Sequence, residues 1–208
     1  MTARLLIPHL ARAVSWGPLG AAMLLAVAAQ VSVLADEPLE WAVLSGLWLA
    51  AGVLGAGSGF ALPDLMGSTV ITPVPRWVRQ WLRTGLVLLP AVLVWVSIYV
   101  GVRRVVGPAL TWPTGYVILQ AAVCGLLPIA AAAVGARYRD TTIAALAGPA
   151  VQGVLLVVTL FFTQQASPWS MPEPGGWTVA QQGWPVALAL ALVTLVLANR
   201  ESTSPAGA

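Results

Sequence analysis

Few side chains in this chain of 208 residues could carry out chemistry on their own. There is one histidine, His9, and one cysteine, Cys124. Ser58 lies in the glycine-rich stretch 56–59, but a serine nucleophile needs a base within hydrogen-bond reach, usually a histidine. His9 precedes the first apolar run and cannot reach Ser58 from there. We therefore interpret Ser58 as a small packing residue, and Cys124, which lies in an apolar run, as a small hydrophobic one.

The inventory of reactive residues excludes several classes of protein. All ten basic residues are arginines, so the chain lacks the lysine of a phosphate-binding loop and the lysine of a Schiff base. A lone histidine excludes a bis-histidine haem within one chain, and a lone cysteine excludes an internal disulfide. The His-Glu-x-x-His motif of metalloproteases is missing as well. The sequence therefore predicts a protein that is not an enzyme by itself and holds neither a metal ion nor a cofactor.

The composition predicts an integral membrane protein. Hydrophobic residues make up 59% of the chain, charged residues only 8%, and the mean hydropathy is +0.86. Soluble domains carry about 25% charged residues, because ionic groups have to cover their surface. The formal net charge is +3, but the arginines stand between apolar runs. Membrane topology explains this placement better than a nucleic-acid-binding surface does, so no nucleic acid is expected as a partner.

Because charges are so few, the uncharged intervals outline the membrane spans. About 20 apolar residues cross a bilayer as a helix, and the long uncharged runs of this chain have a suitable length. They do not alternate in polarity as membrane β-strands do. We predict an all-α integral membrane protein with a single transmembrane domain over residues 1–208. Its six spans are predicted near 15–35, 42–62, 84–102, 114–134, 143–164 and 183–199.

The distribution of arginines predicts which side of the membrane each loop faces. With the N-terminus in the cytoplasm, the inner segments hold all the arginines except Arg103 and Arg104, which lie in an outer segment. Both termini are then cytoplasmic. Residues 1–14 mix aliphatic with charged side chains and are predicted to form an elbow helix at the inner interface. The apolar run that follows is longer than the core of a signal peptide, so we expect it to be retained as the first span.

Three loops carry further information. The first inner loop, 63–83, closes on the segment 76–83, whose arginines and tryptophans fall on opposite faces of a helix with about 100° per residue. We predict there a short amphipathic helix lying at the inner interface, with tryptophans toward lipid and arginines toward water, lipid phosphate or a partner. The second inner loop, 136–142, is short and polar. The outer segment 166–182 is interrupted by Pro and Gly and is predicted to be an interfacial or re-entrant hairpin.

The polar side chains inside the predicted spans are uncharged. The interior contains no Asp, Glu, Lys, Arg or His, which disfavours a proton relay or an ion-coupled carrier. Most of its polar side chains are expected to form hydrogen bonds between helices. Gln120 and Gln152 are the most deeply embedded, so they are the candidates for lining a substrate path.

One segment and the predicted architecture resemble a known family. Leu62-Pro63-Asp64-Leu65 is followed by Thr69, Thr72-Pro73, Pro75-Arg76 and Arg79-Gln80-Trp81-Leu82-Arg83, before a third span with a proline. With six spans, an N-terminal elbow and a long first inner loop, this chain is similar to the ABC-2 type permeases, which are the membrane halves of ATP-binding cassette exporters. It looks like the small form encoded by GC-rich actinobacteria. The resemblance covers the whole chain as architecture and about residues 62–90 as sequence.

The resemblance implies a subunit of a larger exporter in the bacterial cell membrane. A separate ATP-binding cassette ATPase would hold ATP and Mg²⁺, and the two inner loops of this chain would dock on it as coupling elements. The residues implied in coupling are Pro63, Asp64, Thr72, Arg76, Arg79, Arg83, Arg137, Arg139 and Asp140. A second permease half, either another copy or a paralogue, would complete the path. The substrate expected from family habit is apolar or amphipathic: a peptide, an antibiotic, a drug or a lipid.

Two other hypotheses stay open. The chain could be a membrane assembly or immunity subunit that transports nothing. It could also be a standalone carrier or channel, which the uncharged spans disfavour. Copurification of an ATPase that depends on the two inner loops would favour the permease over both.

Overall fold

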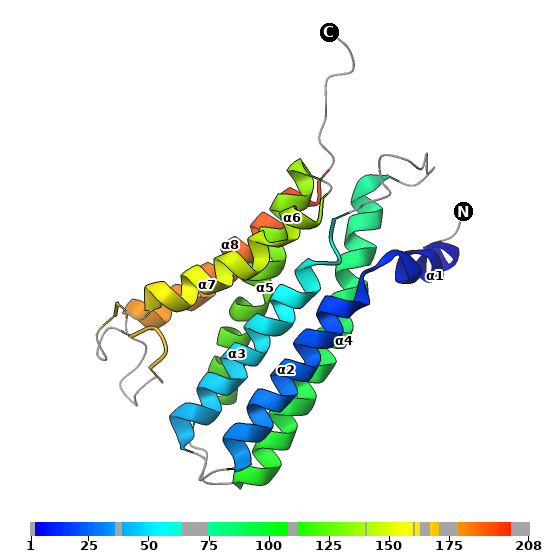
Figure 1. The fold of residues 1–208 in the computed structure, drawn as a ribbon. Coiled ribbons are helices and arrows are strands. Elements are labelled where there is room, and N and C mark those ends of the chain that lie inside the picture. Colours follow the sequence, from blue (N-terminus) through cyan, green and yellow to red (C-terminus); the bar gives the residue numbers. More distant parts are fainter. Residues whose placement is uncertain are drawn as a thin grey trace.

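The computed structural model describes residues 3–35, 39–63, 75–107, 112–139, 141–159, 161–162, 167–170 and 179–200. Within these ranges every regular element is a helix, which confirms the predicted all-α class (Figure 1). The helices are α1 (Ala3–Ala13), α2 (Trp16–Ala35), α3 (Glu40–Gly59), α4 (Arg76–Val106), α5 (Thr114–Tyr138), α6 (Thr142–Ala145), α7 (Ala147–Thr159) and α8 (Val179–Ala198).

Five of these helices are long and apolar enough to cross a membrane. They are α2, α3, α4, α5 and residues 181–198 of α8. They coincide with the predicted spans near 15–35, 42–62, 84–102, 114–134 and 183–199. Their outer faces carry large apolar side chains that no part of the described chain covers, such as Leu24 and Leu89, which are 75% and 63% exposed. Such faces suit a lipid environment, so the described part of the chain is that of a membrane protein.

The segment predicted as the span 143–164 is divided into two helices. It forms the four-residue α6 and the 13-residue α7, with Leu146 between them. Pro149 accounts for the division, because a proline cannot donate to the carbonyl four residues earlier and its ring clashes with that group. Here that residue is Ala145, the last residue of α6. The apolar helical stretch Thr142–Val158 is shorter than the five spans, and a sixth crossing of the membrane remains a prediction.

α4 is longer than the span predicted at 84–102. It has 31 residues, about 46 Å, and its first two turns are the segment 76–83. The prediction of a separate amphipathic helix in that segment is therefore wrong. Trp77 and Trp81 are exposed, as expected for lipid-facing rings, but Arg83 is only 5% exposed and faces the bundle. The segment 76–83 does have a tryptophan face and an arginine face, but the arginine face is turned toward protein rather than water.

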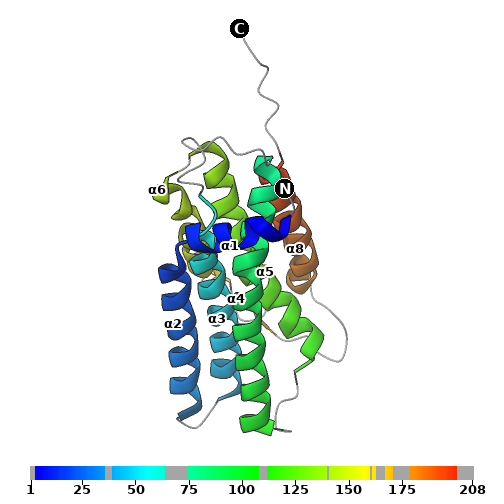
Figure 2. The same ribbon diagram turned by 90° about the vertical axis from the view of Figure 1, so that its right-hand side faces the viewer.

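The helices are arranged around α3 and α5, which form the centre of the bundle. α2 and α4 pack on α3, while α7 and α8 pack on α5. α3 and α5 approach closely because glycines face each other: a Cβ on Gly55 would overlap the carbonyl oxygen of Gly125. Figure 2 shows α1 lying crosswise to α2, α3 and α4, as expected of an elbow.

The two ends of the bundle differ in charge. α1, the start of α4 and the ends of α5 and α8 lie at one end, with the turn before α6 (Figure 1). We call it the arginine-rich end, because its described charged residues are the arginines 4, 12, 76, 79, 83, 137, 139 and 200, with His9 beside them. At the opposite end the described charged residues are Glu40, Arg103 and Arg104. This separation is the one used to predict the orientation from the sequence, and a cytoplasmic location of the arginine-rich end remains a prediction.

Candidate functional site

At the arginine-rich end, arginines of α4 bind backbone carbonyls that belong to the two inner loops. Arg83 Nη1 donates to the carbonyl of Pro63, just after α3, at 3.0 Å. Arg76 Nη2 donates to the carbonyl of Ala136, in the last turn of α5, at 2.7 Å. The last carbonyls of a helix have no partner within it and carry a partial negative charge, so a guanidinium is well suited to bind Ala136, and the buried carbonyl of Pro63 likewise needs a donor. α4 thus ties the ends of α3 and α5 together.

A third arginine holds the end of α8. Arg137 Nη1 donates to the carbonyl of Leu197, and lies 3.5 Å and 3.3 Å from the carbonyl oxygens of Ala198 and Arg200. The helices α3, α5 and α8 all end at this side of the bundle; α5 and α8 have an arginine on their final carbonyls, and the segment just after α3 has one on the carbonyl of Pro63. The arginines here therefore have a structural task in addition to any contact with a partner.

The implied coupling residues fall into three groups. Pro63 and Arg83 are buried, and Arg76, Arg79 and Arg137 are half-buried. Arg139 is exposed. The predicted contacts of Asp64, Thr72 and Asp140 lie outside the described residues. The structure therefore joins the described ends of loops 63–83 and 136–142, through the bond from Arg76 to Ala136.

Arg139 and three large apolar side chains are exposed at the corner between α5 and α6. Tyr138 is 78% exposed and Ile143 is 68% exposed, and Leu146 at the end of the corner is 52% exposed. We call residues 138, 139 and 141–146 the α5–α6 corner. It is fixed to the bundle by close packing, since a Cβ on Gly135 would overlap the carbonyl of Ala144. A rigid projection that combines apolar side chains with a cation is suited to contact with another protein.

At the opposite end, residues 167–170 are held inside the bundle. The carbonyl oxygen of Pro168 accepts hydrogen bonds from Trp184 Nε1 at 2.8 Å, and from Tyr116 Oη and Gln120 Nε2 at 3.4 Å each. The ring of Trp169 packs between two other tryptophans, with its centroid 4.7 Å from that of Trp48 and 5.1 Å from that of Trp184. This part of the predicted outer hairpin 166–182 therefore enters the bundle between α3, α5 and α8.

The two candidate path residues have different surroundings. Gln120 is fully buried, and its amide nitrogen binds the Pro168 carbonyl, so within one chain it fastens the segment 167–170. Gln152 lies in a groove of about 350 Å³, lined by Ser45, Trp48 and Leu49 of α3, by Leu156 and Val157 of α7, and by Trp169. Its amide packs over Gly52, where a Cβ would overlap it. Of the two glutamines, only Gln152 borders an open space in the described chain.

The tryptophan cluster was missed by sequence reasoning. Trp48, Trp169 and Trp184 come from three distant segments, and the sequence predicted only that the segment 166–182 forms an interfacial or re-entrant hairpin. A useful signal was the presence of Tyr116 and Gln120 one turn apart on one helix face, because such donors in a membrane require an acceptor. Which carbonyl they would bind could not be known before the fold.

No group of three or more His, Cys, Asp or Glu side chains that could hold a metal ion occurs among the described residues. The Ser58 hydroxyl is fully buried and donates to the carbonyl of Leu54, one turn earlier, at 2.7 Å. Its surroundings are those of a packing residue. Comparison of the chain with family models, with curated proteins and with solved structures finds no match.

Proposed function

We propose that this chain is the membrane-spanning permease subunit of an ATP-binding cassette exporter. A separate ATPase binds and hydrolyses ATP, and the chain moves an apolar or amphipathic substrate outward across the bacterial cell membrane. It works as one of two permease halves. The sequence supports this division of labour, because a chain without lysine lacks the phosphate-binding lysine of a P-loop ATPase.

The observation that carries the proposal is the hydrogen bond from Arg76 to Ala136, which connects the two inner loops. An ATPase that drives movement of a membrane bundle has to bind it at contacts that are connected to one another. The bonds of Arg76 and Arg83 link the beginning of α4 to the ends of α3 and α5. A force applied to either loop is thereby passed to the central pair of helices.

The α5–α6 corner supplies the contact for the ATPase. Tyr138 and Ile143 are among the most exposed large hydrophobic side chains at the arginine-rich end, and Arg139 lies between them. Buried apolar anchors with a charged neighbour give affinity and orientation to a protein interface. Arg76, Arg83 and Arg137 act behind this surface by holding the helix ends in place.

The substrate path runs along the groove between α3 and α7 that contains Gln152. A single bundle of this size encloses no wide channel, so the second permease half forms the other wall of the path. Gln120, which binds the Pro168 carbonyl, acts on the path only through the segment 167–170.

The test is purification of the tagged chain from its native membrane in mild detergent, followed by mass spectrometry and an ATPase assay with orthovanadate. We expect an ATP-binding cassette subunit and vanadate-sensitive hydrolysis of ATP. Arg139→Glu and Ile143→Asp should each release the ATPase, because they place a negative charge in the apolar contact. Arg104→Glu, at the other end of α4, is the matched control and should retain it.

Two results would count against the proposal. A preparation with no nucleotide-hydrolysing subunit would favour the membrane assembly or immunity subunit that transports nothing. An ATPase that stays bound to both corner variants would show that the corner is not its docking site. Export itself is tested in inverted vesicles, where ATP-dependent uptake of the substrate should require this chain.

A further inference from the structure

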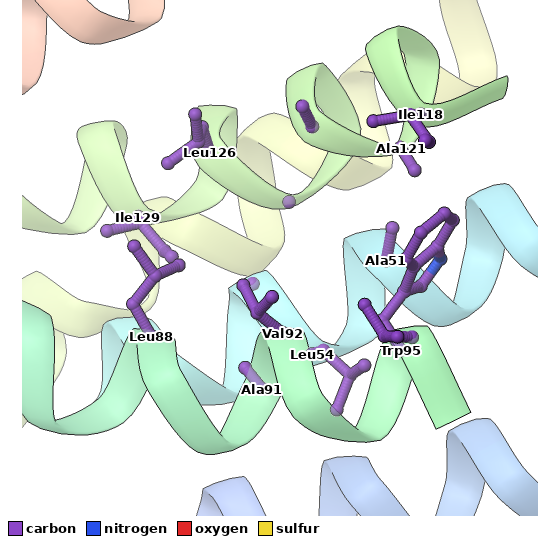
Figure 3. A pocket seen from close by; sticks show the side chains of 14 residues that line it. Ala51, Leu54, Leu88, Ala91, Val92, Trp95, Ile118, Ala121, Leu126 and Ile129 are labelled. Atoms are coloured by element: carbon purple, nitrogen blue, oxygen red, sulfur yellow. The ribbon is translucent and has the colours of Figure 1, made fainter. Parts of the chain in front are cut away.

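An apolar groove runs along the side of the bundle between α4 and α5. Both helices pack on α3, but they make little contact with each other. The space between them has a volume of about 290 Å³, and every residue that lines it is hydrophobic or glycine. Figure 3 shows Leu88 and Val92 of α4 facing Ile129 and Leu126 of α5 across this space.

The groove is closed at one end and open along its side. Near its closed end Trp95 stacks on Tyr99, with ring centroids 5.4 Å apart, and the Tyr99 hydroxyl donates to Thr114 Oγ1 at 3.0 Å. This bond joins α4 to α5 at the end opposite the arginines. Val92 and Val96, in the wall of the groove, are 47% and 43% exposed. An elongated apolar molecule can therefore reach it from the lipid side.

A polar notch lies on the same two helices at the arginine-rich end. It is lined by Arg76 and Gln80 of α4, by Ala133 and Arg137 of α5, and by residues 198–200. Gln80 lies two turns before Leu88, so the notch and the groove are about 12 Å apart along α4. The notch has a volume of about 10 Å³, enough for one water, so a larger group can occupy only its mouth.

Two polar atoms in the notch lack a partner among the described residues. They are the donor Asn199 Nδ2 and the acceptor Gln80 Oε1, on side chains that are 4% and 6% exposed. Leaving such a group unsatisfied costs about 1–3 kcal/mol. One water in the notch can bond both atoms and pass the contact on to a ligand at its mouth. The guanidinium groups of Arg76 and Arg137 beside them favour an anionic ligand.

We propose that the groove and the notch together bind one anionic phospholipid. Its acyl chain lies between α4 and α5, and its phosphate lies across the mouth of the notch against Arg76 and Arg137. One water in the notch links the phosphate and headgroup at its mouth to Gln80 and Asn199. Basic pockets between membrane helices attract anionic headgroups, and an apolar cleft exposed to the bilayer has to be filled by hydrocarbon. The site lies apart from the α3–α7 groove, so it does not depend on the transport function.

The test is native mass spectrometry of the purified full chain with phosphatidylglycerol and phosphatidylcholine in equal amounts. We expect one tightly retained lipid, with phosphatidylglycerol preferred. Val92→Trp should lower retention of both lipids about tenfold, the loss expected when two methylene groups are displaced from the groove. Val100→Trp is the matched control, because Val100 is 40% exposed on the same helix and does not line the groove.

The headgroup is tested separately. Arg137→Gln should lower the affinity for phosphatidylglycerol about fivefold and that for phosphatidylcholine by less, because the choline cation already offsets the charge of its phosphate, while Arg104→Gln should change neither. Equal retention of the two lipids by the parent chain would overturn the headgroup site. Equal effects of the tryptophan substitutions would overturn the groove. A Val92→Trp chain that keeps the lipid but changes from dimer to monomer would show that the groove is instead covered by a second copy.

Discussion

Replacing Gly55 by alanine tests the close contact between α3 and α5. An added Cβ would overlap the carbonyl oxygen of Gly125 and lie 2.8 Å from its carbonyl carbon. Carbon atoms in contact are about 3.5–4.0 Å apart, so the two backbones would have to separate by about 1 Å. Overpacking of this kind costs about 1–3 kcal/mol. Because the atoms that the new Cβ meets belong to the backbone, we expect Gly55→Ala to lower the free energy of unfolding by about 2 kcal/mol.

Gly101→Ala is the control for this prediction. Gly101 is inside α4, and a Cβ there would meet no atom within 4 Å. Alanine should therefore raise the free energy of unfolding by about 0.5–1 kcal/mol through helix propensity alone. Both changes can be measured by equilibrium unfolding in mixed micelles of mild detergent and dodecyl sulfate, followed by tryptophan fluorescence. If Gly55→Ala is as stable as Gly101→Ala, the two helices are not packed as closely as described.

Two further predictions concern the ends of the bundle. Trp169→Ala should lower the free energy of unfolding by about 3–5 kcal/mol, because two ring contacts are lost. The control Trp41→Ala, at a position 67% exposed, should lower it by less than about 1 kcal/mol. Equal losses for the two variants would argue against the tryptophan cluster. Arg137→Gln should accelerate hydrogen exchange about fivefold at the amides of 197–200, where a bond worth about 1 kcal/mol is removed, and not at those of 183–186. Acceleration along the whole of α8 would instead indicate global destabilisation.

The sequence was sufficient for the five long helices. Except at the start of α4, their predicted limits are close to the observed ones because charges are so rare that almost every charged residue marks the end of a span. The same logic failed at 76–83, where three arginines suggested that the helix would leave the bundle. Arg76 and Arg83 instead remain at its side, since carbonyls of α3 and α5 accept their hydrogen bonds. Those acceptors exist only in the folded bundle.

The sequence contains a reason for the division of the segment 143–164, but it does not decide between a kink and a break. Pro149 lies inside this predicted span, but a membrane span tolerates a proline when its neighbours satisfy the freed carbonyl. A choice between a kink and two separate helices depends on packing, and here α5 contacts α6 and α7 closely at Gly135 and Gly148. The candidate path residues also depended on packing. Gln120 and Gln152 lie equally deep in their predicted spans, yet of the two only Gln152 lines the groove between α3 and α7.

The carbonyl of Pro168 has one donor more than it can satisfy well. A carbonyl oxygen offers two lone pairs, and three donors converge on this one. Trp184 makes the short hydrogen bond, at 2.8 Å, while Tyr116 and Gln120 make longer ones, both at 3.4 Å. Loss of the Tyr116 hydroxyl or of the Gln120 amide therefore leaves another long hydrogen bond on this carbonyl. Loss of the Trp184 indole removes its shortest one.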